Sequence, residues 1–152
     1  MTIRAASTLT AVALTYEPGE LDTLTRTVWG EARGEADAGR VAVAWCIRNR
    51  ASIRPVAWWG GSIGAVCRKP RQFSCWNEED PNCAKLTALA VDDPLYQHIL
   101  GLCRDVLAGR VPDSTGGADH YQVIGTGAAW SHGKKPSAII GRHAFYRLGP
   151  NA

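Results

Sequence analysis

The sequence predicts a single, mainly helical domain of the α+β class, with long loops and at most a small β element. Three observations lead to this prediction. The chain has 152 residues, 45% of them hydrophobic, which is enough for one buried core. Before Gly109, apolar residues recur at helical steps of three and four in several segments. After Gly109 this pattern ends and the chain becomes rich in glycine.

The chain begins with residues 1–15, a mildly apolar run that we interpret as a leader or N-terminal arm ahead of a domain spanning 16–152. The first strong helical segment runs from Glu20 to about Arg33, and Gly34 is expected to stop it. Its apolar stripe consists of Leu21, Leu24, Val28 and Ala32. A second helix is expected over 37–51. It is apolar on most sides, which is typical of a central core helix.

Residues 53–81 form a loop-rich region interrupted by prolines, in which Gly60-Gly-Ser-Ile-Gly64 matches the Gly-x-Ser-x-Gly nucleophile motif. That motif needs a strand before its serine, and none is expected here. We therefore interpret Ser62 as the N-cap of a short helix over 62–67. Further helices are expected over 82–90 and from Asp93-Pro94 to Gly109, and the run 143–147 alternates like a short strand.

The composition excludes several classes of protein. The 17 Lys and Arg residues against 14 Asp and Glu give a net charge of +3, which suits a polyanionic partner without selecting one. The five cysteines are an odd set without a Cys-x2-Cys pair, so neither a zinc ribbon nor a complete disulfide framework is indicated. Metal-binding motifs are also missing, and we expect no metal and no other cofactor. No apolar run approaches the roughly 20 residues of a membrane span.

Aromatic residues in the loop-like sequence suggest a sugar-binding groove. A pyranose stacks one face on an aromatic ring, while its hydroxyls need polar partners such as Gln72, Asn77, Thr115 and Gln122. In any fold of this size some of these aromatic side chains belong to the core instead. The set comprises Trp58, Trp59, Phe73, Trp76, Tyr121 and Trp130.

The stretch Trp29-Gly-Glu-Ala-Arg-Gly-Glu35 places two glutamates at the end of the first helix. An apolar wall beside a glutamate keeps its proton available near neutral pH, so this stretch is a candidate acid site. A single helical glutamate is more often ordinary surface. The evidence for catalysis must therefore come from other parts of the chain.

Five segments in a fixed order supply that evidence, because together they resemble the SleB-like cell wall hydrolases, a family typified by the spore-cortex-lytic enzyme and also used by phages as endolysins. The segments are Val28–Glu35, Gly39–Ala44 with Asn49-Arg50, Arg71–Ser74, Asp113–Tyr121 and Ile140–Tyr146. The resemblance implies a lysozyme-like helical fold that acts on peptidoglycan. It also implies a catalytic glutamate at the end of the first helix, which corresponds to Glu31.

The resemblance leaves two mechanisms open. A hydrolase needs a second carboxylate, for which Asp113 and Asp119 are the candidates. A lytic transglycosylase uses one glutamate as acid and then as base, and the resemblance favours this mechanism. Site and structural roles are equally open for His120 and His143. The expected glycan-binding residues are Gln72, Phe73, Ser74, Trp76, Thr115, His120, Tyr121 and His143.

Two other classes fit parts of the sequence. A Cys/His amidase or endopeptidase could act on the same polymer, since Cys67, Cys75 and Cys83 coexist with several histidines. A non-catalytic glycan-binding domain is the second alternative. In all three cases the expected partner is the glycan strand of peptidoglycan, with no nucleic acid, and the chain is expected to be a monomer. We expect action at the murein layer, reached by export or by holin-assisted release from a host cytoplasm.

Overall fold

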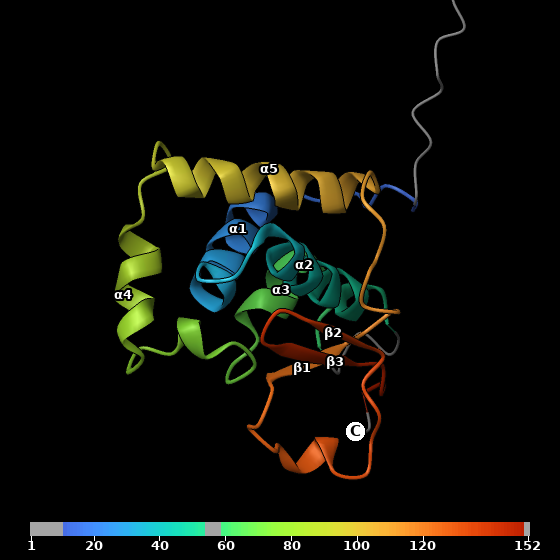
Figure 1. Cartoon of the computed structure of the whole chain (residues 1–152). Helices are drawn as coiled ribbons and strands as arrows, with labels where there is room; N and C mark the ends of the chain where they lie inside the picture. Colours follow the sequence, from blue (N-terminus) through green and yellow to red (C-terminus); the bar gives the residue numbers. More distant parts are fainter. Residues whose placement is uncertain (1–10, 54–58, 151–152) are drawn as a thin grey trace, which may run out of the picture.

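The structure, a computed structural model, describes residues 11–53 and 59–150 and contains five α-helices and a small sheet (Figure 1). Trp58, a predicted groove residue, and residues 1–10 of the predicted leader lie outside the described residues. The α-helices are α1 (Pro18–Ala32), α2 (Asp37–Ser52), α3 (Ile63–Arg68), α4 (Pro81–Ala88) and α5 (Pro94–Ala108). The mainly helical α+β class is confirmed, and each α-helix lies where the sequence predicts one.

Local sequence explains where the helices begin and end. Ser62 caps α3 by accepting a hydrogen bond from the backbone amide of Ala65, so its predicted role as an N-cap is confirmed. Asp93 caps α5 in the same way through the Tyr96 amide. Gly109 ends α5 with a φ of 73°, a left-handed conformation that glycine adopts without strain.

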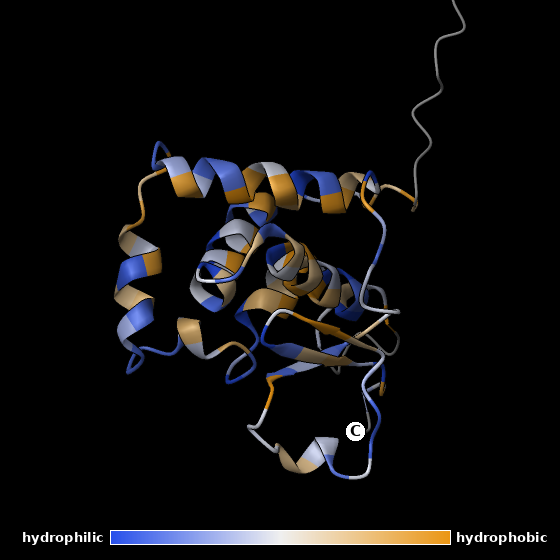
Figure 2. Ribbon diagram, viewed as in Figure 1, coloured by the Kyte–Doolittle hydropathy of each residue, from blue (hydrophilic) through white to orange (hydrophobic). Residues whose placement is uncertain are grey.

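Helix α2 is the centre of the core, as predicted. It contacts α1, α3 and α5 on its helical sides and the sheet at its C-terminal end. Helix α5 crosses α1 and α2 at one edge of the domain and turns its hydrophobic side toward them (Figures 1 and 2). Ile47 of α2, Leu24 of α1 and Ile99 of α5 are fully buried in this shared core. The apolar spacing of the three helices thus fixes the scaffold on which the other elements rest.

The sheet has three antiparallel strands in the order β1-β3-β2. Strand β3 (His143–Tyr146) was expected, whereas β1 (His120–Val123) and β2 (Ala138–Ile140) were not. Every residue of β3 is buried, because β1 and β2 flank it on both sides. In the register of the sheet, Tyr121 of β1 lies opposite Phe145 of β3. The sheet packs against α2, which brings the glycine-rich end of the chain close to the helical core.

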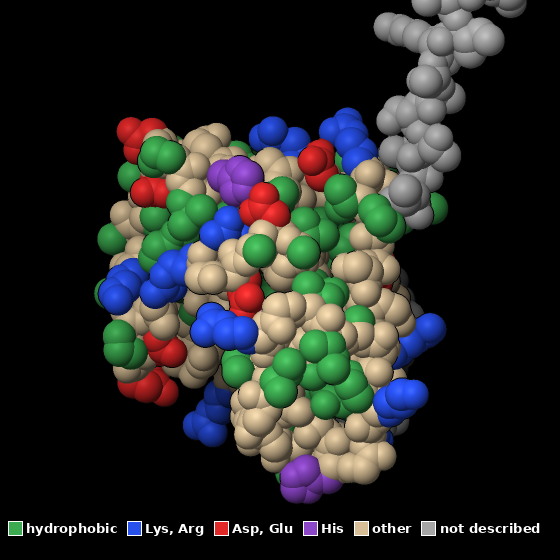
Figure 3. All heavy atoms as spheres, viewed as in Figure 1, with side chains coloured by type: hydrophobic (Ala, Val, Ile, Leu, Met, Phe, Trp, Pro, Cys, Tyr) green, Lys and Arg blue, Asp and Glu red, His purple; other side chains and the backbone are tan. Residues whose placement is uncertain are grey.

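The segment 11–14 runs along the end of α5, where Leu14 donates a backbone hydrogen bond to Leu107. The buried Arg48 of α2 donates to the carbonyl groups of Val12 and Val106 and so links this segment to both helices. Charges of both signs are interspersed on the face shown in Figure 3, as a small net charge leads one to expect. None of the described helices is long and apolar enough to cross a membrane.

Candidate active site

Glu31 lies in the last turn of α1 and points toward the sheet. Its Oε2 atom accepts a hydrogen bond of 3.1 Å from the Tyr121 hydroxyl, a contact between residues 90 positions apart. Its Oε1 atom is buried and has no hydrogen-bond partner among the described residues. Burial raises the pKa of Tyr121 well above its usual value, and the nearby Glu31 carboxylate raises it further. Tyr121 therefore stays protonated and can only donate to Glu31.

Glu35, the other glutamate of the motif, is largely buried. Its side chain is only 8% exposed, and its Oε1 atom lies 3.2 Å from Arg142 Nε and 3.4 Å from His143 Nδ1. Arg33 instead bonds to Asn82, and its guanidinium covers the Trp29 ring that we had considered as an apolar wall for Glu31. The two glutamates of the motif thus have different environments.

His143 connects these two environments. Its ring packs edge-on against Tyr121 at a centroid distance of 5.2 Å, while its Nδ1 atom faces Glu35. Burial lowers the pKa of His143 from 6.5; Arg142 lowers it further, whereas Glu35 and Glu31 oppose the shift. The neutral imidazole is therefore the stable form in the folded protein.

This pKa shift predicts a pH dependence of stability. Below pH 6.5 His143 binds a proton more readily in the unfolded chain than in the folded one. The stability that the neutral imidazole contributes is therefore complete above about pH 6.5 and is lost as the pH falls through the folded-state pKa. We expect the thermal midpoint to fall between about pH 7 and pH 5, above the range in which unperturbed carboxylates titrate. In His143→Gln this part of the fall should disappear. An equal fall in the variant would contradict the assignment.

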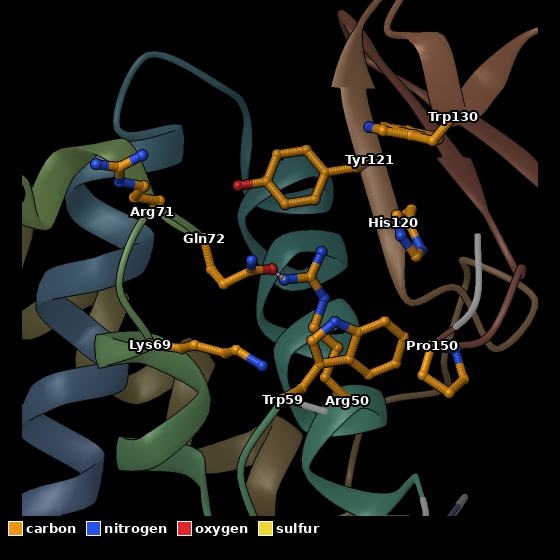
Figure 4. Close-up of a pocket in the computed structure, with 9 residues that line it drawn as sticks. All are labelled: Arg50, Trp59, Lys69, Arg71, Gln72, His120, Tyr121, Trp130 and Pro150. Atoms are coloured by element: carbon orange, nitrogen blue, oxygen red, sulfur yellow. Dashed lines mark hydrogen bonds between the residues drawn. The ribbon is translucent and has the colours of Figure 1, made fainter. Parts of the chain in front are cut away.

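A cavity of about 440 Å³ opens beside Tyr121, next to the catalytic candidate (Figure 4). One side is aromatic, because the His120 ring packs between Trp59 and Trp130 at centroid distances of 5.5 and 4.9 Å. The other side carries three cations, Arg50, Lys69 and Arg71. The volume lies within the range of small-molecule sites, about 300 to 1,000 Å³. The cavity combines stacking surfaces with charge.

The structure brings together some of the residues predicted to bind glycan. Gln72, His120 and Tyr121 line the cavity. Trp76 lies in a second groove on the other side of the Lys69-Pro-Arg71 segment, where its indole donates to Thr27 and Arg68 covers its ring. Ser74 is exposed at the start of η1 (Ser74–Trp76).

Phe73 belongs to the core instead, since its side chain is 3% exposed, and His143 is likewise buried behind Tyr121. Phe73 therefore supports the cavity from below, as the Arg50 guanidinium lies 5.3 Å from its ring. Its neighbour Gln72 is exposed and lies in a turn, and its side-chain oxygen accepts a hydrogen bond from Arg50.

Asp113 and Thr115 hold the loop before the sheet together rather than facing the cavity. Asp113 accepts hydrogen bonds at both oxygens, from the backbone amide and hydroxyl of Thr115 at Oδ1 and from Asn49 and Gly117 at Oδ2. Thr115 is completely buried and donates only within this loop. The expectation that Thr115 contacts a glycan is therefore corrected, because its hydroxyl is used inside the fold.

Asp119, the other candidate for a second carboxylate, is 1% exposed. It accepts hydrogen bonds from His120 Nδ1 and from the backbone amides of Leu148 and Gly149. Although burial opposes the shift, these hydrogen bonds hold its pKa below the usual value. Asp119 thus fixes the C-terminal segment and orients His120, and its oxygens are already occupied.

Four of the five cysteines are not placed for nucleophilic catalysis. All five are free, and Cys46, Cys67, Cys75 and Cys103 are buried. Burial raises the pKa of the Cys46 and Cys67 thiols to about 12, and it also raises that of Cys75, to which the nearby Glu31 adds. A thiol with a raised pKa is a poor nucleophile near neutral pH. Cys46 and Cys103 are completely buried in the core, where they pack as small apolar residues.

Sequence reasoning missed Arg50 and Lys69 as site residues. Arg50 was noted only as part of the resemblance, although an arginine on an otherwise apolar helix was a signal in itself. Lys69 carried no signal, because only the fold brings it opposite Arg50. Within 11–53 and 59–150, no group of three His, Cys, Asp or Glu side chains is close enough to hold a metal ion.

The fold and the site together define a lysozyme-like enzyme, in which a helix-end glutamate faces a small antiparallel sheet beside an aromatic cavity. The chain belongs to the cell wall hydrolase family, whose model matches residues 34–146. The matched span contains the sheet and all cavity-lining residues except Pro150, and it begins just after Glu31. The predicted membership of a SleB-like family is thereby confirmed, and the chain is a peptidoglycan-degrading enzyme.

Two solved structures support this assignment. The catalytic domain of the Bacillus cereus SleB protein is 25% identical, with a TM-score of 0.69 over 90% of this chain and 95% of that one. The catalytic domain of the germination-specific lytic transglycosylase SleB from Bacillus anthracis is also 25% identical, with a TM-score of 0.67 over 90% and 100%. The comparison with curated proteins gave no match. The likeness to the solved structures covers a larger share of the chain than the family model does.

Proposed function

We propose that this protein is a lytic transglycosylase that cleaves the MurNAc-β-1,4-GlcNAc bond of peptidoglycan, with Glu31 as its one catalytic carboxyl group. The similar domain from Bacillus anthracis carries the name of a lytic transglycosylase. The place of action that follows is the murein layer, where the enzyme would serve as an endolysin or in wall remodelling.

One observation carries this proposal. Glu31 has one oxygen held by Tyr121 and the other without a partner, whereas the oxygens of Asp113 and Asp119 are engaged inside the fold. A hydrolase needs a second carboxylate as base or nucleophile on the opposite face of the sugar. Neither aspartate has an oxygen to spare for that role, and a mechanism with a single carboxyl group is favoured.

The chemistry requires two proton transfers by the same group. Glu31 first donates its proton to the glycosidic oxygen while the bond from C1 of the muramyl sugar to that oxygen breaks. The carboxylate then removes the proton from the 6-hydroxyl of the same sugar, whose oxygen forms a new bond to C1. The products are a 1,6-anhydro end and a free 4-hydroxyl, and no water is consumed. Glu31 recovers its proton, and the Tyr121 hydroxyl stabilises its anionic state between the two steps.

The Tyr121→Phe variant tests the contribution of this hydroxyl. It removes one oxygen atom and leaves the ring that packs against His143. We expect kcat/KM for purified peptidoglycan to fall roughly ten- to hundredfold, since a hydrogen bond to a charged group contributes about 1.5 to 3 kcal/mol. Release of soluble fragments gives the rate.

Tyr96→Phe is the matched control. The hydroxyl of Tyr96, on α5, also donates to a carboxylate, that of Asp22, but this pair does not belong to the site. This variant should lose stability and keep kcat/KM. If the two variants have the same kcat/KM as the parent, Tyr121 does not support the chemistry.

A further inference from the structure

The cationic side of the cavity has no counter-charge. Among the described residues no carboxylate lines the cavity, and Arg50, Lys69 and Arg71 form no ion pair. Figure 4 shows the Arg50 guanidinium at its centre, with the Lys69 ammonium group extending toward it. Three positive groups that surround an open space without an acid are suited to an anionic ligand.

Arg50 is the most informative of the three, because it is 93% buried (7% exposed) and still charged. Its hydrogen bonds go to uncharged oxygens, the Asp119 backbone carbonyl at 2.5 Å and the Gln72 side-chain amide at 3.2 Å. Trp59 and Phe73 cover its faces. A buried cation is normally paired with an anion, so the opening of the cavity is where the missing anion would enter.

Arg71 adds an independent observation. Its φ is 63°, and it is the one non-glycine residue with positive φ in the part of the chain that the structure describes. A long side chain in this left-handed conformation is strained, and such strain gathers at ligand sites. Glycine would fit this turn better. The arginine is therefore explained by what its side chain does at the cavity rim.

We propose that this cavity binds a carboxylate carried by the muramyl arm of the glycan strand. A pyranose on the aromatic side would rest against Trp130, and its 3-O-linked acidic arm would reach Arg50, Lys69 and Arg71. Arginine binds carboxylates with two parallel hydrogen bonds, which makes it the suitable residue type. Two sources supply this chemistry, the lactyl carboxylate of a peptide-free muramic acid and the free carboxylates of a stem peptide.

The inference rests on the proposed function, since it takes the glycan strand as the ligand. The experiment compares kcat/KM on four substrates: peptide-bearing strands, strands stripped of peptide by an amidase, and each of these two forms after carbodiimide amidation of its carboxylates. We expect kcat/KM to be about tenfold higher for strands with free carboxylates than for the amidated strands, because amidation removes one charged hydrogen bond. If this ratio is larger for peptide-bearing strands, the stem peptide supplies the carboxylate. If it is larger for stripped strands, the lactyl group supplies it.

Two variants assign the preference to the cavity. Arg71→Gly and Lys69→Gln should each reduce it severalfold while cleavage of amidated strands continues. Arg71→Gly is expected to fold at least as well as the parent, because glycine is relaxed at this φ. Arg104→Gln and Lys85→Gln, exposed on α5 and α4 outside both grooves, are matched charge controls and should keep the preference.

A binding measurement tests this inference independently of the proposed reaction. Affinities of the Glu31→Gln variant for free and amidated oligosaccharides can be measured by titration calorimetry without turnover. A preference for the free carboxylates that Arg71→Gly removes supports the cavity assignment, even if the parent makes no anhydro product. Equal affinities or rates for free and amidated strands overturn it, as does a preference that Arg71→Gly and Lys69→Gln leave unchanged.

Discussion

Replacing Glu31 by glutamine is expected to lower kcat on purified peptidoglycan by a factor of about a thousand or more. Glutamine keeps the shape of the side chain and can still accept the Tyr121 hydrogen bond, but it has no proton to give to the leaving oxygen. General acid and base catalysis each contribute roughly 10² to 10⁴. The proposed mechanism assigns both steps to this residue. Soluble glycan released per unit time is the measurement.

Glu35→Gln is the comparison that assigns the acid to one of the two glutamates. Glu35 is paired with Arg142 and lies beside the His143 ring, so its replacement should weaken the packing beneath the site and reduce stability. We expect kcat to fall less than tenfold. A thousandfold loss in Glu35→Gln together with an active Glu31→Gln would transfer the catalytic role to Glu35.

Replacing Asp113 by alanine should lower the free energy of unfolding by about 3 kcal/mol, the scale for breaking a buried hydrogen-bond network. The carboxylate accepts four hydrogen bonds that tie the loop of Thr115 and Gly117 to Asn49 of α2. Without it, the half-buried amide of Asn49 and the Thr115 hydroxyl each lose a partner. Chemical denaturation measures the change.

Asp113→Asn separates this structural role from catalysis. The amide can replace part of the network, so the loss of stability should be smaller and kcat of the folded fraction should stay within a few-fold of the parent. A kcat that collapses in Asp113→Asn at unchanged stability would make this residue a second catalytic carboxylate. That outcome would support a hydrolase.

The helices were predictable because their causes are local. The apolar spacing of Leu24 and Val28, the caps at Ser62 and Asp93, and the glycine at 109 each act within a few residues. Strands β1 and β2 were missed, since three or four residues carry too short a pattern and their stability comes from pairing with β3.

The site was only partly predictable for the same reason. Glu31 stood out once five ordered segments were combined, and Gln72 and Tyr121 followed from their residue types and loops. The sequence does not distinguish an aspartate that faces a substrate from one that holds a loop together through hydrogen bonds, as Asp113 does. The pairing of Glu35 with Arg142 spans 107 positions and depends on the tertiary fold. The cationic side of the cavity likewise exists only after α2 and the loop at Lys69 meet.

The identity of the cleaved end tests the central claim most directly. Purified peptidoglycan is digested by the parent enzyme in water enriched in ¹⁸O, and the soluble products are analysed by mass spectrometry. A transglycosylase with Glu31 as its single carboxyl group predicts 1,6-anhydro-muramyl ends without ¹⁸O, because water takes no part in the reaction. Reducing ends that carry ¹⁸O would contradict the account and indicate a hydrolase, and freed stem peptides without glycan cleavage would indicate an amidase.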